Sequence, residues 1–135
     1  MTTFELNAVH RYAFRFAQTD VEAFARVTGD DNPLHLSEEF ASQTPFKRPI
    51  IHGMLGASVF TKVLGTQFPG HGSVYLKQTL EFLRPMFVEM DYEAVFTVIS
   101  LNPDKNTAEV STEIKDAKTG KVTTRGVATL LYKKG

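Results

Sequence analysis

A run of apolar and small residues, His52 to Leu64, constrains the fold of this chain more than any other feature. It reads His-Gly-Met-Leu-Gly-Ala-Ser-Val-Phe-Thr-Lys-Val-Leu, and Lys62 is its only charged residue. A helix that is apolar around nearly its whole circumference has to be buried on most sides. The glycines and the alanine let another part of the chain pack closely against it. We therefore predict a buried helix over 52–64 that ends at Gly65, a typical C′ residue.

The second half of the chain has the pattern of β-strands joined by tight turns. Residues 102–106 and 116–120 are rich in turn-forming residues and predict hairpin connections. Residues 9–17 alternate imperfectly between apolar and polar, as in a strand. The chain is therefore predicted to be α+β, with one curved, mostly antiparallel sheet wrapped around the helix. The four stretches rich in Val, Thr, Ile, Phe and Tyr are Val74–Phe82, Glu93–Leu101, Ala108–Lys115 and Val122–Leu131.

Length and composition exclude several classes of protein. The chain has 135 residues, which suits one domain over 1–135. Its 15 basic and 15 acidic residues cancel, and nucleic-acid or anionic-membrane binding usually needs a basic surplus. It has no cysteine, which excludes disulfides and a thiolate nucleophile. Neither a signal-peptide pattern nor a membrane-spanning apolar run is found, so we expect a cytoplasmic protein.

The region before the apolar helix reads as a short helix followed by a long loop. Thr19 and Glu22 have the spacing of a capping box, which predicts a helix over 20–27 that Gly29 ends. Residues 29–51 contain three prolines and read as an irregular loop, in which residues 37–41 form one helical turn. A loop of this length in a compact domain usually has a function.

Two residues in this loop are candidates for acid–base chemistry. Asp30 and His35 lie five residues apart, and Asn32-Pro33 predicts a turn that brings them together. A carboxylate and an imidazole can hold one water molecule and transfer its protons. A pair of this kind is also common as a turn aspartate and a hydrogen-bonded loop histidine. The neighbouring Asp31 is read as structural or solvent-facing.

The start of the apolar helix is a candidate oxyanion-binding site. Backbone N–H groups at a helix N-terminus point outward with partial positive charge, and Gly53 would let a carbonyl oxygen approach them closely. The alternative is that Gly53 is a packing glycine and His52 a core histidine. A metal site formed by Asp30, His35 and His52 is conceivable, but no metal-binding spacing supports it. The sequence predicts neither a metal nor a cofactor.

Together these residues resemble the MaoC-like (R)-specific enoyl-CoA hydratases, also called hydratase 2. The similarity covers about residues 10–132. One departure is visible, because Glu89-Met90 stands where the family usually has Gly-Asp. The first block of matching positions comprises Phe24, Val27, Thr28, Gly29, Asp30, Asn32, Pro33, Leu34, His35 and Ala41. The second comprises Phe46, Arg48, Pro49, Ile50, His52, Gly53, Met54, Leu55, Ala57 and Ser58.

The resemblance implies a hot-dog fold, a homodimer and an acyl-CoA substrate bound near the subunit interface. It implies hydration of trans-2-enoyl-CoA to (R)-3-hydroxyacyl-CoA, and the reverse dehydration. Asp30 and His35 would be the catalytic pair, and the Gly53 amide would bind the thioester oxygen. We further expect the substrate to contact four residues: Asn32, His52, Leu55 and Ser58.

Three alternatives remain open at this point. The same chemistry could act on an acyl-carrier-protein thioester. A thioesterase would attack the thioester carbon instead of the double bond. A non-catalytic acyl-binding module would have no use for an intact acid–base pair.

Overall fold

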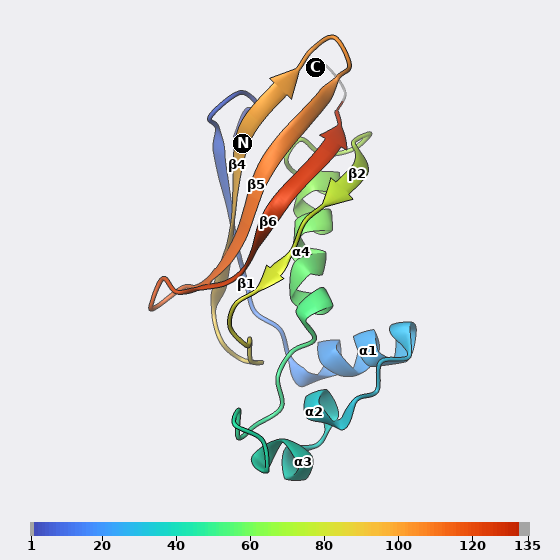
Figure 1. Ribbon diagram of the computed structural model, residues 1–135, viewed down its shortest axis with the longest axis vertical. Helices are drawn as coiled ribbons and strands as arrows, with labels where there is room; N and C mark the ends of the chain where they lie inside the picture. The colour runs from blue at the N-terminus through green and yellow to red at the C-terminus, as the bar shows by residue number, and fades with distance from the viewer. Residues whose placement is uncertain (1, 133–135) are drawn as a thin grey trace.

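The computed structural model describes residues 2–132. A six-stranded antiparallel sheet lies against one long helix, α4 (Gly53–Thr66), as Figure 1 shows. The strand order is β1-β4-β5-β6-β2, and the short strand β3 also pairs with β6. The strands are β1 (Val9–Phe14), β2 (Val74–Gln78), β3 (Glu81–Phe82), β4 (Tyr92–Asn102), β5 (Thr107–Asp116) and β6 (Val122–Leu131). The predicted α+β class is therefore correct.

Burial explains why α4 and the sheet stay together. Seven of its residues, from Leu55 to Leu64, are buried. Six of them, all except Gly56, belong to one apolar cluster that also includes Phe96 of β4 and Ile114 of β5. Strand β5 alternates buried and more exposed positions along most of its length, with its buried side chains toward the helix layer. The burial of an almost entirely apolar helix is thus the main contact between the two layers.

Three short helices gather at the N-terminal end of α4, below the sheet in Figure 1. They are α1 (Gln18–Thr28), α2 (Pro33–Leu36) and α3 (Glu38–Ser42). Gly29 ends α1 as predicted: its φ is 82°, and its N–H donates to the Ala25 carbonyl at 2.8 Å. The loop predicted over 29–51 is therefore more ordered than expected, with the predicted turn near residues 37–41 present as α3.

Three predicted boundaries are wrong. Helix α1 begins at Gln18, and the Asp20 carboxylate accepts the Ala17 N–H at 2.8 Å, so Thr19 and Glu22 do not form the capping box. Helix α4 continues through Gly65 to Thr66, because Gly65 keeps a helical backbone instead of turning left-handed. The strand predicted over 74–82 is divided into β2 and β3.

The division of that strand has a packing cause. A Cβ at Gly126 of β6 would lie 1.7 Å from the carbonyl oxygen of Thr79, between β2 and β3. The Thr79 N–H also forms a hydrogen bond with β6, donating to the Val127 carbonyl at 3.0 Å. The backbone therefore crosses β6 at a distance that only glycine permits.

The departure from the family pattern at Glu89 leaves the turn in place. Glu89 has a φ of 58°, in the left-handed region that glycine favours, and its N–H donates to the Phe16 carbonyl at 2.8 Å.

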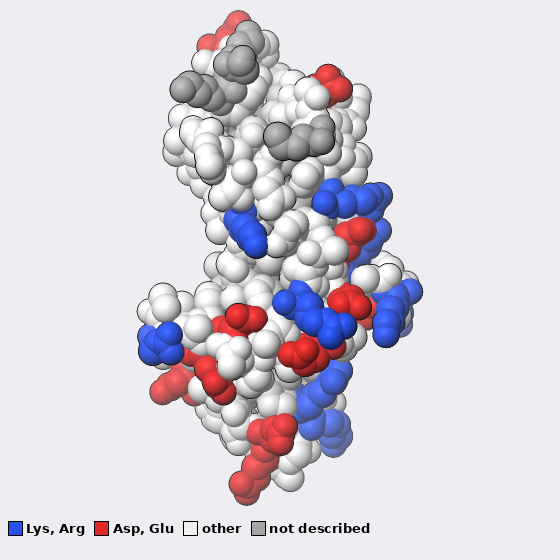
Figure 2. Space-filling view, turned by 180° about the vertical axis from the view of Figure 1, so that it is seen from behind, with Lys and Arg blue, Asp and Glu red and all other residues white. Residues whose placement is uncertain are grey.

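Charges do not gather by sign on the face opposite that of Figure 1. Figure 2 shows basic and acidic side chains interspersed over its middle and lower parts. Some of the charged side chains form ion pairs, such as Arg15 and Asp91 at 2.9 Å. Within residues 2–132, none of the helices has both the length and the apolar character needed to cross a lipid bilayer.

Candidate active site

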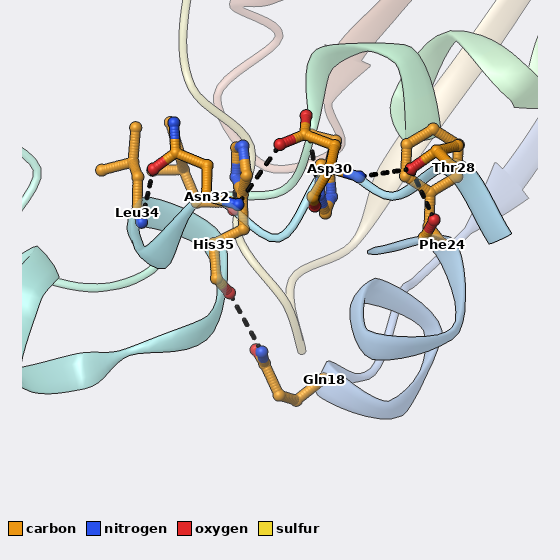
Figure 3. A network of polar contacts seen from close by, with 9 residues as sticks. Gln18, Phe24, Thr28, Asp30, Asn32, Leu34 and His35 are labelled. Carbon is orange, nitrogen blue, oxygen red and sulfur yellow. Dashed lines mark hydrogen bonds and ion pairs between the residues drawn. The ribbon is translucent and has the colours of Figure 1, made fainter. Parts of the chain in front are cut away.

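The loop between α1 and α2 is held in shape by its own side chains, as Figure 3 shows. The Asn32 side chain accepts the Leu34 N–H at 3.0 Å and caps α2, where Pro33 occupies the first turn. Asp30 accepts the Asn32 N–H at 3.3 Å, and Thr28 accepts the Asp30 N–H at 3.2 Å. The predicted Asn32-Pro33 turn is confirmed, and it places Asp30 and His35 on the same side.

His35 is buried, and its protonation pattern follows from its partners. Its Nδ1 lies 2.7 Å from the Ile50 carbonyl oxygen, which can only accept a hydrogen bond. Neutral His35 therefore carries its proton on Nδ1, and Nε2 is left with a lone pair. Gln18 also binds the His35 carbonyl oxygen, at 3.1 Å. This arrangement is what a general base requires: a fixed ring with one nitrogen available.

Asp30 brings a carboxylate to the same place, in contact with solvent. Its side chain is 52% exposed, and Oδ2 lies 4.0 Å from His52 Nε2. One side-chain donor or acceptor atom from each of Asp30, His35 and His52 lies within 4.8 Å of the other two. Two atoms at such a separation can share one water molecule through two hydrogen bonds of about 2.8 Å. The pair can therefore hold a water between an ionisable carboxylate and an imidazole.

The same three side chains are also a set of metal-ligand types. Main-chain carbonyls already engage His35 Nδ1 and His52 Nε2, so each ring keeps one nitrogen. A carbonyl behind an imidazole is equally usual for metal-bound and for acid–base histidines. The nitrogen that remains on His52 is Nδ1, which is buried, so a metal would have Asp30 and His35 as its accessible ligands, and the proposed mechanism depends on no metal.

Helix α4 directs its N-terminus at this cluster. Its Leu55 and Gly56 N–H groups donate to the His52 carbonyl, at 3.0 and 3.2 Å, so the open end of the helix is formed by the earlier amides. Gly53 lines a cleft of about 360 Å³ together with Asp30 and His35. The remaining residues that line it are Phe24, Thr28, His52 and Met54. An oxygen atom in this cleft would meet the positive end of the helix dipole.

The other predicted substrate-binding residues lie in different places. Ser58 lines an adjoining cleft of about 430 Å³ along α4, on the side of β2. Leu55 is buried in the apolar cluster between α4 and the sheet, and lines none of the clefts described in this section. Asn32 uses its side-chain oxygen to cap α2, next to the site. His52 lies directly behind His35, with ring centroids 3.8 Å apart.

Sequence reasoning missed the main-chain partners of the site. The Ile50 carbonyl fixes His35, and the Asp30 carbonyl fixes His52, yet carbonyl groups leave no trace in a residue pattern. Phe82 was also missed, although its ring lies over the helix start, 2.8 Å from where a Gly53 Cβ would be.

The fold and site define an α+β hydratase-like protein, and comparisons with known proteins agree. A family model described as "MaoC like domain" matches residues 3–124, and the chain belongs to this family. It is 46% identical over 110 residues to the (R)-specific enoyl-CoA hydratase of Aeromonas caviae, which covers 82% of each chain. The match confirms the resemblance stated above.

Solved structures support the same family. The (R)-hydratase from A. caviae superposes with a TM-score of 0.91 at 42% identity, over 96% of this chain and 97% of that one. An R-hydratase from Pseudomonas aeruginosa, in its unliganded form, gives a TM-score of 0.91 at 34% identity, over 97% of this chain and 83% of that one. The fold is therefore the hot-dog fold of these hydratases.

Proposed function

We propose that this protein is an (R)-specific enoyl-CoA hydratase, which adds water to trans-2-enoyl-CoA and forms (R)-3-hydroxyacyl-CoA, reversibly. One observation supports this most: Asp30, His35 and the N-terminus of α4 at Gly53 line one cleft. Hydration of an enoyl thioester needs an activated water, a proton donor and a site for negative charge. The cleft offers a group for each of them.

The Gly53 amide would bind the thioester carbonyl oxygen. As the water oxygen bonds to Cβ, the π electrons of the double bond shift toward Cα and the thioester carbonyl, and negative charge develops on this oxygen. A backbone N–H at a helix N-terminus stabilises that charge more than the neutral carbonyl of the substrate, which lowers the barrier. Gly53 carries no side chain to cover the helix amides, and the Phe82 ring lies where its Cβ would be, so we propose that the oxygen approaches the amides beside this ring.

Asp30 and His35 would share the attacking water. One of the pair takes a proton from it as the oxygen bonds to Cβ, and one of the pair returns a proton to Cα. The double bond is consumed, and the net addition is one water. Asp30 and His35 line the same cleft, so we propose that H and OH add to the same face of the double bond. The two groups act as a coupled pair.

The clefts on either side suggest how the thioester lies. The cleft of about 430 Å³ along α4 has no charged residue in its lining and would take the acyl chain. A second cleft, of about 450 Å³, shares Gly53 and Met54 with the catalytic cleft and contains Arg84. A cation there suits the phosphate-bearing carrier, so we propose that the pantetheine arm leaves on this side.

We also propose that two copies form a homodimer through the region of β2 and β3. Strand β2 is at one end of the sheet, so one of its edges is unpaired. Apolar side chains are exposed along the same region, and a partner would cover them. They are Val74, Tyr75, Leu76, Phe82 and Leu83. Sedimentation should give a dimer at micromolar concentration, and a stable monomer would contradict this proposal.

Two further expectations accompany the proposed function. We propose that residues 1–135 behave as one domain, which limited proteolysis would test by yielding no stable fragment. We also propose that the enzyme acts in the cytoplasm, as the lack of cysteine and the CoA substrate favour. Fractionation of the cells that produce it would test this.

The deciding experiment combines crotonyl-CoA with the purified protein and follows loss of the enoyl chromophore. Chiral analysis of the product should give the (R)-3-hydroxy isomer. Rapid release of free CoA without hydration would instead indicate a thioesterase. Faster turnover on the acyl-carrier-protein thioester than on the CoA thioester would indicate a dehydratase of fatty-acid synthesis.

A further inference from the structure

The His52 side chain is almost completely buried and packs against two other rings. Its side chain is 2% exposed, against 52% for Asp30. The ring of His35 stacks on it with a centroid distance of 3.8 Å and an interplanar angle of 27°, and the Phe24 ring lies 4.8 Å away. A side chain with this little exposed surface offers little contact to a substrate. Its contacts are with the catalytic loop itself.

The hydrogen bonds of His52 define a single neutral tautomer. Its Nε2 lies 3.0 Å from the main-chain carbonyl oxygen of Asp30, so Nε2 carries the proton and donates it. Its Nδ1 is buried and has no hydrogen-bond partner among the residues that the structure describes. Protonating Nδ1 would bury an N–H group without an acceptor, which is unfavourable. Neutral His52 therefore keeps its proton on Nε2.

The unpartnered Nδ1 calls for an explanation. A phenylalanine would fill the same space between Phe24 and His35 without burying an unsatisfied nitrogen. What phenylalanine lacks is the Nε2–H group that binds the Asp30 carbonyl. A histidine at this position thus leaves Nδ1 without a partner, which is unfavourable, but it supplies the Nε2–H hydrogen bond to the main-chain carbonyl of Asp30.

We propose that His52 is a positioning residue that holds Asp30 and His35 in register with each other. This inference rests on the proposed hydratase function. The Nε2–H bond fixes the backbone of Asp30, and the flat face of the ring fixes the plane of His35. His52 is also the N-cap of α4 and directly precedes Gly53. Its side chain therefore connects both members of the pair to the start of the oxyanion-binding helix. Contact with substrate is not part of this role.

The first test reads the tautomers directly in the unmodified protein. Long-range proton–nitrogen correlation spectra of ¹⁵N-histidine-labelled protein distinguish Nδ1–H from Nε2–H rings, and single substitutions assign the signals. We expect His52 as the Nε2–H tautomer and His35 as the Nδ1–H tautomer. An Nδ1–H tautomer at His52 would overturn the proposal. This result does not depend on whether the protein hydrates enoyl-CoA.

The second test separates the two contacts of the ring by substitution. His52→Gln keeps an N–H donor at the position of Nε2, whereas His52→Phe keeps the flat ring and loses the donor. Displacing a catalytic group by about 1 Å can cost up to about 100-fold in rate. We therefore expect His52→Phe to lower kcat by about 10- to 100-fold with KM for crotonyl-CoA within about twofold, and His52→Gln to restore most of kcat.

Controls and contrary outcomes are specific. His10→Gln is the matched control, because His10 also stacks on an aromatic ring, Phe68, at 5.1 Å, but lies outside the site. It should leave kcat unchanged. A higher KM with normal kcat in His52→Phe would indicate substrate binding and overturn the positioning role. So would equal losses in both variants. If His52→Phe does not fold, a tenfold loss in folded His52→Gln would be the contrary result. Wild-type protein without hydratase activity would refute the proposed function alone.

Discussion

The two ends of helix α4 differ in their exposure to solvent and in the side chains that surround them. At its N-terminal end, His52 and Gly53 line a solvent-accessible cleft, and the Met54 side chain is 57% exposed. At the other end, Phe60 and Val63 are completely buried. Phe60 meets Phe96 of β4 edge to face, with ring centroids 5.8 Å apart and an interplanar angle of 87°. One end is polar and open, and the other is dry and closely packed.

This difference shows how a small fold supports a reactive site. The N-terminal end leaves helix amides open and buries a histidine nitrogen without a partner, and both features are unfavourable for folding. At the C-terminal end the Leu64 carbonyl accepts the Gly70 N–H at 3.1 Å, and aromatic packing contributes favourably through buried area. Substitutions at the two ends should therefore change different quantities: turnover at the first, and the free energy of unfolding at the second.

The largest effect is expected at the acid–base pair. Asp30→Ala and His35→Ala should each lower kcat/KM on crotonyl-CoA by about 10²–10⁴-fold, because each removes a proton-transfer group. The double variant should lose far less than the product of the two, because one water serves both. Thermal unfolding measured alongside should change little.

Asp31 supplies the control for this experiment. It is exposed and lies next to Asp30, so Asp31→Ala should keep near-native activity. Unchanged turnover in Asp30→Ala or in His35→Ala would remove that residue from the mechanism, and fully additive losses would assign the two to separate steps.

The opposite behaviour is expected at the packed end of the helix. Phe60→Ala should lower the free energy of unfolding by about 3–5 kcal/mol, through lost transfer energy and the cavity left behind. Turnover per folded molecule should stay within about twofold, since the site lies at the other end. Denaturant unfolding and active-site titration measure the two quantities. A large fall in kcat of the folded protein would show that the two ends are coupled.

Two glycines of the same helix sharpen the comparison. Gly53→Val should lower kcat by about 10²–10³-fold by keeping the carbonyl from the helix amides. Gly65→Val is the control, because a Cβ at Gly65 meets nothing within 4 Å. A side chain at Gly53 would also meet the Phe82 ring, so the double variant with Phe82→Ala removes that clash. Recovery of activity in this double variant would contradict the oxyanion role.

The smallest effect concerns the middle of the helix. Ala57 lines the proposed acyl cleft beside Ser58. Ala57→Leu should narrow this cleft and lower the preference for longer over shorter enoyl-CoA chains by about tenfold, as expected for a few methylene groups. The ratio of kcat/KM for C8 and C4 substrates measures it. An unchanged ratio would place the acyl chain elsewhere.

Much of this molecule could be predicted from sequence because its signals are local. The helix over 52–64 and the strands after residue 90 can be predicted from the spacing of their apolar residues. Any fold that buries one face of these segments requires that spacing. Gly29 was recognised as a helix stop because it follows an amphipathic stretch. Asp30 and His35 were identified because a turn-forming Asn32-Pro33 lies between them.

One error is local, because Asp20 and not Glu22 accepts the N-cap amide of α1, and the others depend on tertiary context. The break between β2 and β3 depends on Gly126, which lies more than 40 residues after Thr79 in the sequence. Gly65 reads as a stop, but burial of the neighbouring Leu64 keeps the helix going for another residue. The carbonyl groups that hold the two histidines belong to main chain and have no residue signature. The break between β2 and β3, the end of α4 and the carbonyl partners of the histidines all depend on tertiary packing. Local residue propensities do not encode such packing.

The main-chain contacts of Ile50 and Ile51 have a consequence for divergence among related sequences. The Ile50 N–H donates to the Leu34 carbonyl at 3.3 Å, its carbonyl accepts from His35 at 2.7 Å, and the Ile51 N–H donates to the Met86 carbonyl at 2.8 Å. Because backbone atoms make these bonds, the side chains at 50 and 51 are free to vary as far as His35 is concerned. Proline is the exception, since it lacks the N–H. The orientation of the His35 imidazole can thus be preserved in related sequences even where the residue types at positions 50 and 51 differ.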